Sequence, residues 1–209
     1  MRVSHLLYAL AWLSFGAGHS MLAGARGRGW LEHRFGQGHR LAYNAFAVAH
    51  ILAVVAVGWV LLGDRPAFGL PTPLVWSLHA LSAAGVIAMV IFLRSYDTSR
   101  LIGTAQWRGH GEDDDEPLNL NGPHRWVRHP LYVAGFMILW GRALDPLGLH
   151  TALWGTAYLI VGTLFEERKL LARYGEAYAA YRRSVPMFIP WRKAGSARTR
   201  KGPNGPLNP

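Results

Sequence analysis

The sequence of 209 residues contains no cysteine. Without thiols the chain can form no disulfide bond, thiolate metal site or iron–sulfur cluster, and it has no cysteine nucleophile. Acidic residues are also few, because 12 Asp and Glu stand against 22 Lys and Arg, which leaves a formal net charge of +10. A basic excess can indicate nucleic-acid binding or a membrane surface, and the placement of the charges decides between the two.

The motifs that hold phosphates in soluble enzymes are missing too. Residues 24–29 read GARGRG, but they follow an apolar segment, whereas a dinucleotide fingerprint lies between a strand and a helix. Neither GxSxG nor HExxH occurs, and the acidic run at 111–116 favours a solvated loop over a metal site, because adjacent acids repel one another. We therefore predict no metal site, and any nucleotide cofactor must be held without a glycine-rich nucleotide-binding domain.

Long apolar blocks fill much of the remaining chain and predict an all-α integral membrane protein. A bilayer core of about 30 Å needs about 20 apolar residues in a helix. Three blocks reach that length, and a fourth, 131–165, is too long for one span and is broken near Asp145 and Pro146. We predict five transmembrane helices, the last two forming a helical hairpin, and then a cytoplasmic amphipathic helix. The predicted spans are 3–25, 42–62, 74–93, 131–141 and 147–165.

The positive charges predict the orientation of these spans. Segments 26–40, 94–130 and 166–209 carry four, five and ten Lys or Arg, and the opposite ends carry three in total. Because cytoplasmic loops collect Lys and Arg, we expect the amino end outside and the carboxyl end in the cytoplasm. We also expect the positive charge to contact membrane lipid rather than nucleic acid. We also expect one transmembrane domain at 1–194, a disordered basic tail at 195–209, and a bacterial inner membrane as the location.

Two polar clusters flank the predicted hairpin. The first reads RHPLY at 128–132, which places Pro130 in the first turn of a helix, where its missing N–H costs nothing. Tyr132 then lies in the first turn, and Gly135 leaves space beside the backbone one turn further. Such a cluster is either a helix cap with interfacial anchors or the lining of a binding site.

The second cluster is the pair Glu166 and Glu167, which follows the last predicted span. Two carboxylates at the carboxyl end of a helix oppose the helix dipole, so a sequence shaped only by stability would place them elsewhere. The hairpin brings them near Arg128 and His129. This predicts either a surface ion-pair network or a pocket for a zwitterionic cofactor at the membrane interface.

Two further features extend this region. An amphipathic helix follows the glutamates, and it either anchors in the interface or closes the pocket as a lid. Its predicted aromatic face consists of Leu171, Tyr174, Tyr178 and Tyr181. Polar groups inside spans are costly and point to function by default. His19 in the first span lies at the depth of the two clusters, so it is either a hydrogen-bonded interfacial residue or a functional one.

These residues resemble a known family. The sequences RHPLY at 128–132, EE at 166–167 and YGEAYAAYRRSVPMFIP at 174–190 resemble the isoprenylcysteine carboxyl methyltransferase superfamily, integral-membrane enzymes that use S-adenosylmethionine. The amino half, with GHSMLA at 18–23 and YDTSRLIGTAQ at 96–106, is more similar to the methanethiol S-methyltransferase branch and more distantly to the NnrU-type proteins.

The resemblance implies a membrane methyltransferase that binds S-adenosylmethionine and methylates the sulfur of a small or lipophilic thiol entering from the bilayer. Position by position, it implicates His129, Tyr132, Glu166, Glu167, Tyr178 and Tyr181. Together with the two clusters, this predicts a cofactor-binding set of His124, Arg128, His129, Tyr132, Gly135, Glu166, Glu167, Tyr178 and Tyr181. The predicted catalytic residues are His19, His129 and Arg183, because either imidazole has a suitable reference pKa for a base that takes the thiol proton.

The sequence leaves several possibilities for the group that accepts the methyl. Carboxyl methyltransferases of the superfamily usually carry a basic residue directly before the Val-Pro pair, where this chain has Ser184 next to Arg183. If that basic residue orients a substrate carboxylate, its displacement favours a thiol. The alternatives are carboxyl methylation of a prenylated cysteine or similar lipid, an NADPH-dependent membrane reductase, since sterol reductases share RHPxY-like patterns, and a non-catalytic membrane partner.

Overall fold

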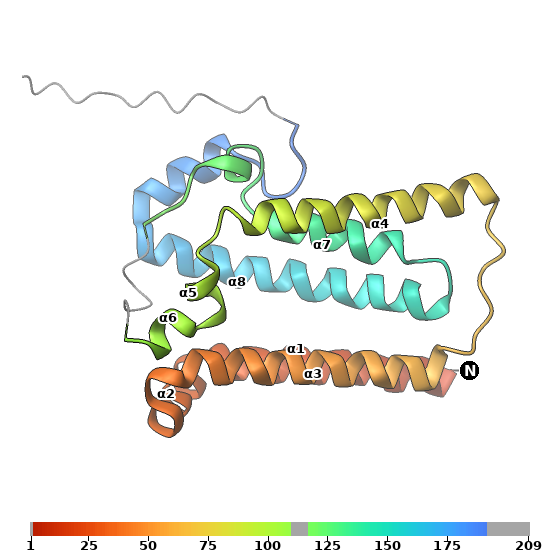
Figure 1. Cartoon of the computed structure of the whole chain (residues 1–209), viewed down its shortest axis with the longest axis horizontal. Helices are drawn as coiled ribbons and strands as arrows, with labels where there is room; N and C mark the ends of the chain where they lie inside the picture. Colours follow the sequence, from red (N-terminus) through yellow and green to blue (C-terminus); the bar gives the residue numbers. More distant parts are fainter. Residues whose placement is uncertain (1, 110–116, 192–209) are drawn as a thin grey trace, which may run out of the picture.

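The computed structural model describes residues 2–109 and 117–191, and within them every regular element is a helix (Figure 1). The elements are α1 (Arg2–Ala23), α2 (Ala25–Phe35), η1 (Gly36–Gly38), α3 (His39–Leu62), α4 (Thr72–Leu93), α5 (Thr98–Ile102), α6 (Thr104–Trp107), η2 (Gly122–Arg125), α7 (Pro130–Gly141) and α8 (Pro146–Ser184). The predicted all-α class is confirmed. The predicted acidic loop at 111–116 and the predicted tail at 195–209 lie outside the described residues.

Four helical stretches are long and apolar enough to cross a membrane: α1, the stretch Ala25–Leu62 that contains α2 and α3, α4, and α8. Large apolar side chains such as Val60, Trp76 and Ile87 are exposed on these helices, and lipid rather than water suits such a surface. The chain is therefore an integral membrane protein. The helix α7 is apolar but has 12 residues, about 18 Å at 1.5 Å per residue, so the count of five spans stays a prediction.

The helices pack as two pairs, with α8 between them (Figure 1). In the first pair, α1 meets α3 closely because Gly58 has no side chain: a Cβ there would lie 2.6 Å from the Tyr8 ring. In the second pair, α7 lies against α4, and a Cβ on Gly141 would meet the backbone N of Ser82 at 2.5 Å. Glycine at these two points lets the backbones approach, as is common between membrane helices.

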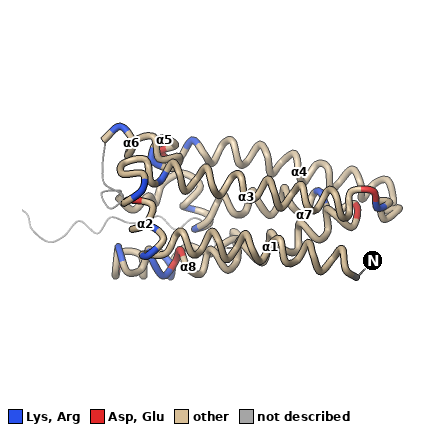
Figure 2. The backbone as a smooth tube through the Cα atoms, turned by 90° about the horizontal axis from the view of Figure 1, so that it is seen from below, with Lys and Arg blue, Asp and Glu red and all other residues tan. Residues whose placement is uncertain are grey.

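Charge is concentrated at one end of the molecule. Lys and Arg gather mainly around α2, α5, α6 and the last turns of α8, while the middle of the bundle is almost free of charge (Figure 2). Physically, this distribution keeps charged groups out of the apolar part of the bilayer. The charged end is the one that we predict to face the cytoplasm.

The helix α8 is longer than the predicted last span, because it continues past Phe165 to Ser184. Asp145 caps its start by accepting the N–H of Gly148 at 2.7 Å. Its backbone leaves the helical range only at Gly175, with φ 54° and ψ −129°. After this kink the helix turns back toward the start of α7 (Figure 1). The predicted amphipathic helix is thus the last part of α8.

Candidate functional site

A buried ion-pair network around Glu167 joins the start of α7 to α8. Arg128 Nε donates to Glu167 Oε1 at 2.6 Å, and Arg182 Nε lies 3.2 Å from Oε2. His129 Nε2 lies 3.2 Å from Oε1. The Glu167 side chain is 5% exposed, so this charge can stay buried only because two guanidinium groups surround it.

The same region fixes the segment that follows α8. The Arg128 guanidinium donates to the carbonyl of Val185 at 2.6 Å. The backbone N–H groups of Arg128 and His129 donate to the carbonyls of Pro186 and Met187 at 2.9 and 3.2 Å. The RHPLY sequence and the VP sequence are therefore two halves of one structure, although they lie far apart in the chain.

The tyrosines of the last part of α8 lie inside this structure. The Tyr178 hydroxyl donates to Glu167 at 3.3 Å, and the Tyr181 hydroxyl donates to the carbonyl of His124 at 2.7 Å. Both rings are buried against Val185. They pack within the network, and neither of them is among the residues that line the cavity described below.

The predicted aromatic face needs one correction. Leu170, not Leu171, packs with Tyr174 against the buried tyrosines, whereas Leu171 is exposed. The physical reason is the non-helical backbone at Gly175, which changes the rotation of the helix between Leu171 and the tyrosines that follow.

His124 is buried beside the network, in η2. Its Nδ1 lies 3.3 Å from the carbonyl of Arg128, and the Tyr96 ring packs edge-on against the imidazole at 5.3 Å. Burial is the largest cause that lowers the pKa of His124 below its usual value, because a low-dielectric surrounding disfavours the charged imidazole. His124 thus supports the structure through its contacts with the Arg128 carbonyl and the Tyr96 ring.

Glu166 differs sharply from its neighbour, although the two are adjacent in the chain. The Tyr132 hydroxyl donates to Glu166 Oε2 at 2.7 Å, and the His129 ring stacks on the Tyr132 ring at 5.4 Å. The Glu166 side chain is 45% exposed and borders a cavity. One carboxylate therefore belongs to the buried network, and the other is available to a ligand.

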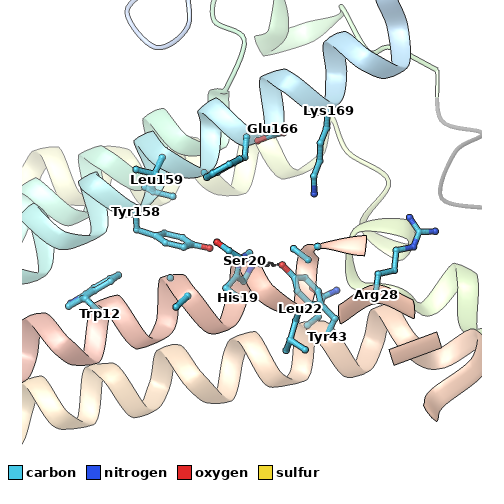
Figure 3. Close-up of a pocket in the computed structure, with 18 of the residues that line it drawn as sticks. Trp12, His19, Ser20, Leu22, Arg28, Tyr43, Tyr158, Leu159, Glu166 and Lys169 are labelled. Carbon is cyan, nitrogen blue, oxygen red and sulfur yellow. Dashed lines mark hydrogen bonds between the residues drawn. The ribbon is translucent and has the colours of Figure 1, made fainter. Parts of the chain in front are cut away.

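The cavity has a volume of about 1060 Å³ and lies between the α1–α3 pair and α8 (Figure 3). Trp12 and Leu159 form part of its apolar wall, and Arg28, Arg40 and Lys169 border its charged end. Among the described residues that line it, Glu166 is the only carboxylate. Sites for organic ligands commonly combine apolar walls with a few polar groups in this way.

His19 lines the same cavity from α1. The Tyr43 hydroxyl lies 2.5 Å from His19 Nε2, and the rings of Phe15 and Tyr158 pack around the imidazole. His19 was predicted from the sequence, whereas Tyr43 and Tyr158 were not. A tyrosine inside an apolar span was the available signal, because its hydroxyl needs a hydrogen-bond partner there.

The structure thus divides the predicted site residues into two groups. The cavity brings together His19, Tyr132 and Glu166. Behind it, the network and its supports contain His124, Arg128, His129, Glu167, Tyr178 and Tyr181. Two predicted residues join neither group. Gly135 faces Leu159 of α8, and Arg183 is exposed and pairs with Glu176.

The fold and the site define a class: a membrane protein that is helical throughout its described regular elements, with a large cavity near its charged end and the Glu166 carboxylate on the cavity wall. Comparison with known proteins gives the particular relatives. The chain is 33% identical over 121 residues to a methanethiol S-methyltransferase from Mycobacterium tuberculosis, an alignment that covers 56% of this chain and 48% of that protein.

Two more relatives extend this result. A methanethiol S-methyltransferase from a Pseudomonas species is 28% identical over 197 residues, covering 88% of this chain and 72% of that protein. A protein-S-isoprenylcysteine O-methyltransferase from Schizosaccharomyces pombe is 29% identical over 126 residues, covering 56% and 51%. The aligned part of this chain spans about half the length of the Mycobacterium and Schizosaccharomyces relatives.

No family model matches the chain, and the comparison with solved structures gave no match. The predicted resemblance to the isoprenylcysteine carboxyl methyltransferase superfamily, and to its methanethiol branch, is confirmed by the names of these relatives.

Proposed function

We propose that this chain is an S-adenosylmethionine-dependent membrane methyltransferase that methylates the sulfur of a small or lipophilic thiol. The proposal is supported by the relatives named methanethiol S-methyltransferase. The single observation that carries it is the cavity of about 1060 Å³, which joins apolar membrane-helix walls to the Glu166 carboxylate.

The chemistry of the cavity fits this cofactor. S-adenosylmethionine supplies a methyl group on a positively charged sulfur. A carboxylate and aromatic faces stabilise such a cation, and Glu166, Tyr132 and Tyr158 provide them. The buried network around Glu167 positions Tyr132 and Glu166. His129 belongs to this network and stacks on the Tyr132 ring, and the Tyr132 hydroxyl donates to Glu166.

The acceptor side of the cavity lies near α1 and α3. A thiol with a pKa near 8.5 needs to lose a proton before it attacks, and an imidazole has a suitable reference pKa. We assign this step to His19, because His129 and Arg183 do not line the cavity. His19 takes the thiol proton, a bond forms between the acceptor sulfur and the methyl carbon, and the bond to the donor sulfur breaks. Alignment of the two reactants by the cavity walls contributes much of the rate.

The membrane arrangement belongs to the same proposal. Five spans, with α7 and α8 as the hairpin, put the amino end outside and the carboxyl end in the cytoplasm of a bacterial inner membrane. The charge at one end of the bundle supports this orientation (Figure 2).

Carboxyl methylation of a prenylated cysteine is the second candidate, and the Schizosaccharomyces relative favours it. Membranes incubated with methyl-labelled cofactor and either a small thiol or a prenylcysteine separate the two. A methyl ester releases volatile methanol in base, whereas a thioether does not. Protection from heat by NADPH, without protection by S-adenosylhomocysteine, would instead support a reductase.

The decisive test is binding of S-adenosylhomocysteine to the purified protein in lipid, measured by calorimetry. We expect Glu166→Gln to weaken the binding of S-adenosylmethionine about tenfold, since a charge interaction of the carboxylate with the positive sulfur, worth about 1.4 kcal/mol, is lost. The binding of S-adenosylhomocysteine, whose sulfur is neutral, should change much less. His19→Ala should lower kcat and leave the binding unchanged. Glu176→Gln, on the surface of α8, is the control and should change neither. Absence of binding to the unaltered protein rejects the proposed function.

A further inference from the structure

Lys169 is a cation of the cavity to which the proposed mechanism assigns no role. It lies on α8 one turn after Glu166, and its side chain extends away from α8 into the cavity (Figure 3). Across the described part of the chain, Lys169 makes no hydrogen bond or ion pair. Arg28, which also borders this end, is instead paired with Glu32 at 2.7 Å.

The two opposite charges of α8 are held apart. Acidic and basic residues three positions apart on a helix usually attract each other, because their side chains lie on one face. Here the Tyr132 hydroxyl holds the Glu166 carboxylate at 2.7 Å, on the side of α7, while Lys169 points to the other side. The cavity therefore presents a carboxylate at one place and an ammonium group at another, and neither neutralises the other.

From this separation we propose that Lys169 binds a carboxylate of the ligand that fills the cavity. The inference rests on the proposed function. Two ligands could bring that carboxylate: the amino-acid end of the donor, or an acid group on the thiol acceptor. In both cases Glu166 faces a cationic part of the donor and Lys169 faces the anion.

A competing explanation is that Lys169 only extends to the membrane surface. Lysines near the end of an apolar helix commonly do so, with the stem along apolar surface and the ammonium group in water. In that case Lys169 has no effect on ligand affinity. Ligand binding thus separates the two explanations, independently of catalytic rate.

The test uses the full chain in lipid nanodiscs and compares Lys169→Met with the unaltered protein. If the donor brings the carboxylate, S-adenosylhomocysteine should bind roughly 10- to 100-fold more weakly to Lys169→Met, the usual effect of losing a charge-assisted hydrogen bond. S-adenosyl-3-thiopropylamine, which lacks only the carboxylate, should bind equally to both proteins. Lys169→Arg should keep most of the affinity, and Arg173→Met, one turn further along α8, is the matched control.

If the acceptor brings the carboxylate, the affinity for both adenosyl compounds stays unchanged in Lys169→Met. The KM for 3-mercaptopropionate should then rise about tenfold or more, while the KM for ethanethiol stays constant. Unchanged values in both comparisons overturn the assignment of Lys169 and leave the methyltransferase proposal intact. No binding to the unaltered protein overturns both.

Discussion

At the scale of single residues, the two adjacent glutamates of α8 show how burial separates chemical roles. Glu167 is enclosed by Arg128, Arg182 and His129, and its negative charge is paired with these groups of the protein itself. Glu166 keeps one oxygen on Tyr132 and remains half-exposed. Removing the first should therefore affect folding, whereas removing the second should affect ligand binding.

We expect Glu167→Gln to lower the free energy of unfolding by about 3–5 kcal/mol, because it leaves buried guanidinium charge without its partner. Thermal unfolding in detergent measures this as a fall in Tm. The matched control is Glu176→Gln on the same helix, whose pair with Arg183 is 79% and 66% exposed and should be worth less than about 1 kcal/mol. Equal effects of the two substitutions would show that the Glu167 network contributes no more than a surface pair.

His124 gives a prediction for pH. Because burial lowers the pKa of His124 in the folded protein, the unfolded chain takes up a proton there more readily. The contribution of His124 to the stability of the folded protein is therefore fully present well above its ordinary pKa of 6.5. This contribution is lost as the pH falls through that value. We expect the Tm to fall between about pH 8 and about pH 5.5, and His124→Gln to reduce that fall. An unchanged slope in the variant would contradict the role of His124.

At the scale of elements, α8 carries most of the site, and its kink makes this possible. A straight helix would carry Tyr178 and Tyr181 away from the start of α7. The turn at Gly175 brings them back to Glu167 and His124, so a single helix contributes both the cavity wall and the support behind it.

The kink also gives a backbone prediction. A φ of 54° with a ψ of −129° is open only to glycine, so Gly175→Ala should cost about 1–3 kcal/mol, even though a Cβ there would meet no atom within 4 Å. Gly162→Ala is the control in the same helix, because its Cβ also meets nothing and its φ is not positive. It should be neutral or slightly stabilising. Denaturation of both variants in one detergent provides the comparison.

At the scale of the whole molecule, the cavity exists because α8 separates two tightly packed pairs of helices. The close packing at Gly58 and Gly141 makes each pair compact, and the space remains between the pairs near the charged end. Under the proposed function and orientation, this position would give a lipophilic acceptor access from the bilayer and the charged cofactor access from the cytoplasm.

The absence of cysteine allows a direct test of that orientation, since any introduced thiol is the only one. In intact cells, a membrane-impermeant thiol reagent should label Ala67→Cys, in the exposed segment between α3 and α4. His33→Cys, exposed on α2, should react only after the membrane is opened. The reverse pattern would show that the amino end lies inside.

Hydropathy and composition are local properties, so the sequence alone determined the helical class, the apolar helices and most of the residues that meet around α8. It could not determine which of the predicted residues line the cavity. That choice depends on the rotation of α8 against α1, α3 and α7. Contacts between residues far apart in the sequence set this rotation, such as the hydrogen bond between Tyr8 and Thr151 at 2.8 Å. Only the tertiary structure, therefore, buried Glu167, left Glu166 beside the cavity and turned Lys169 toward it.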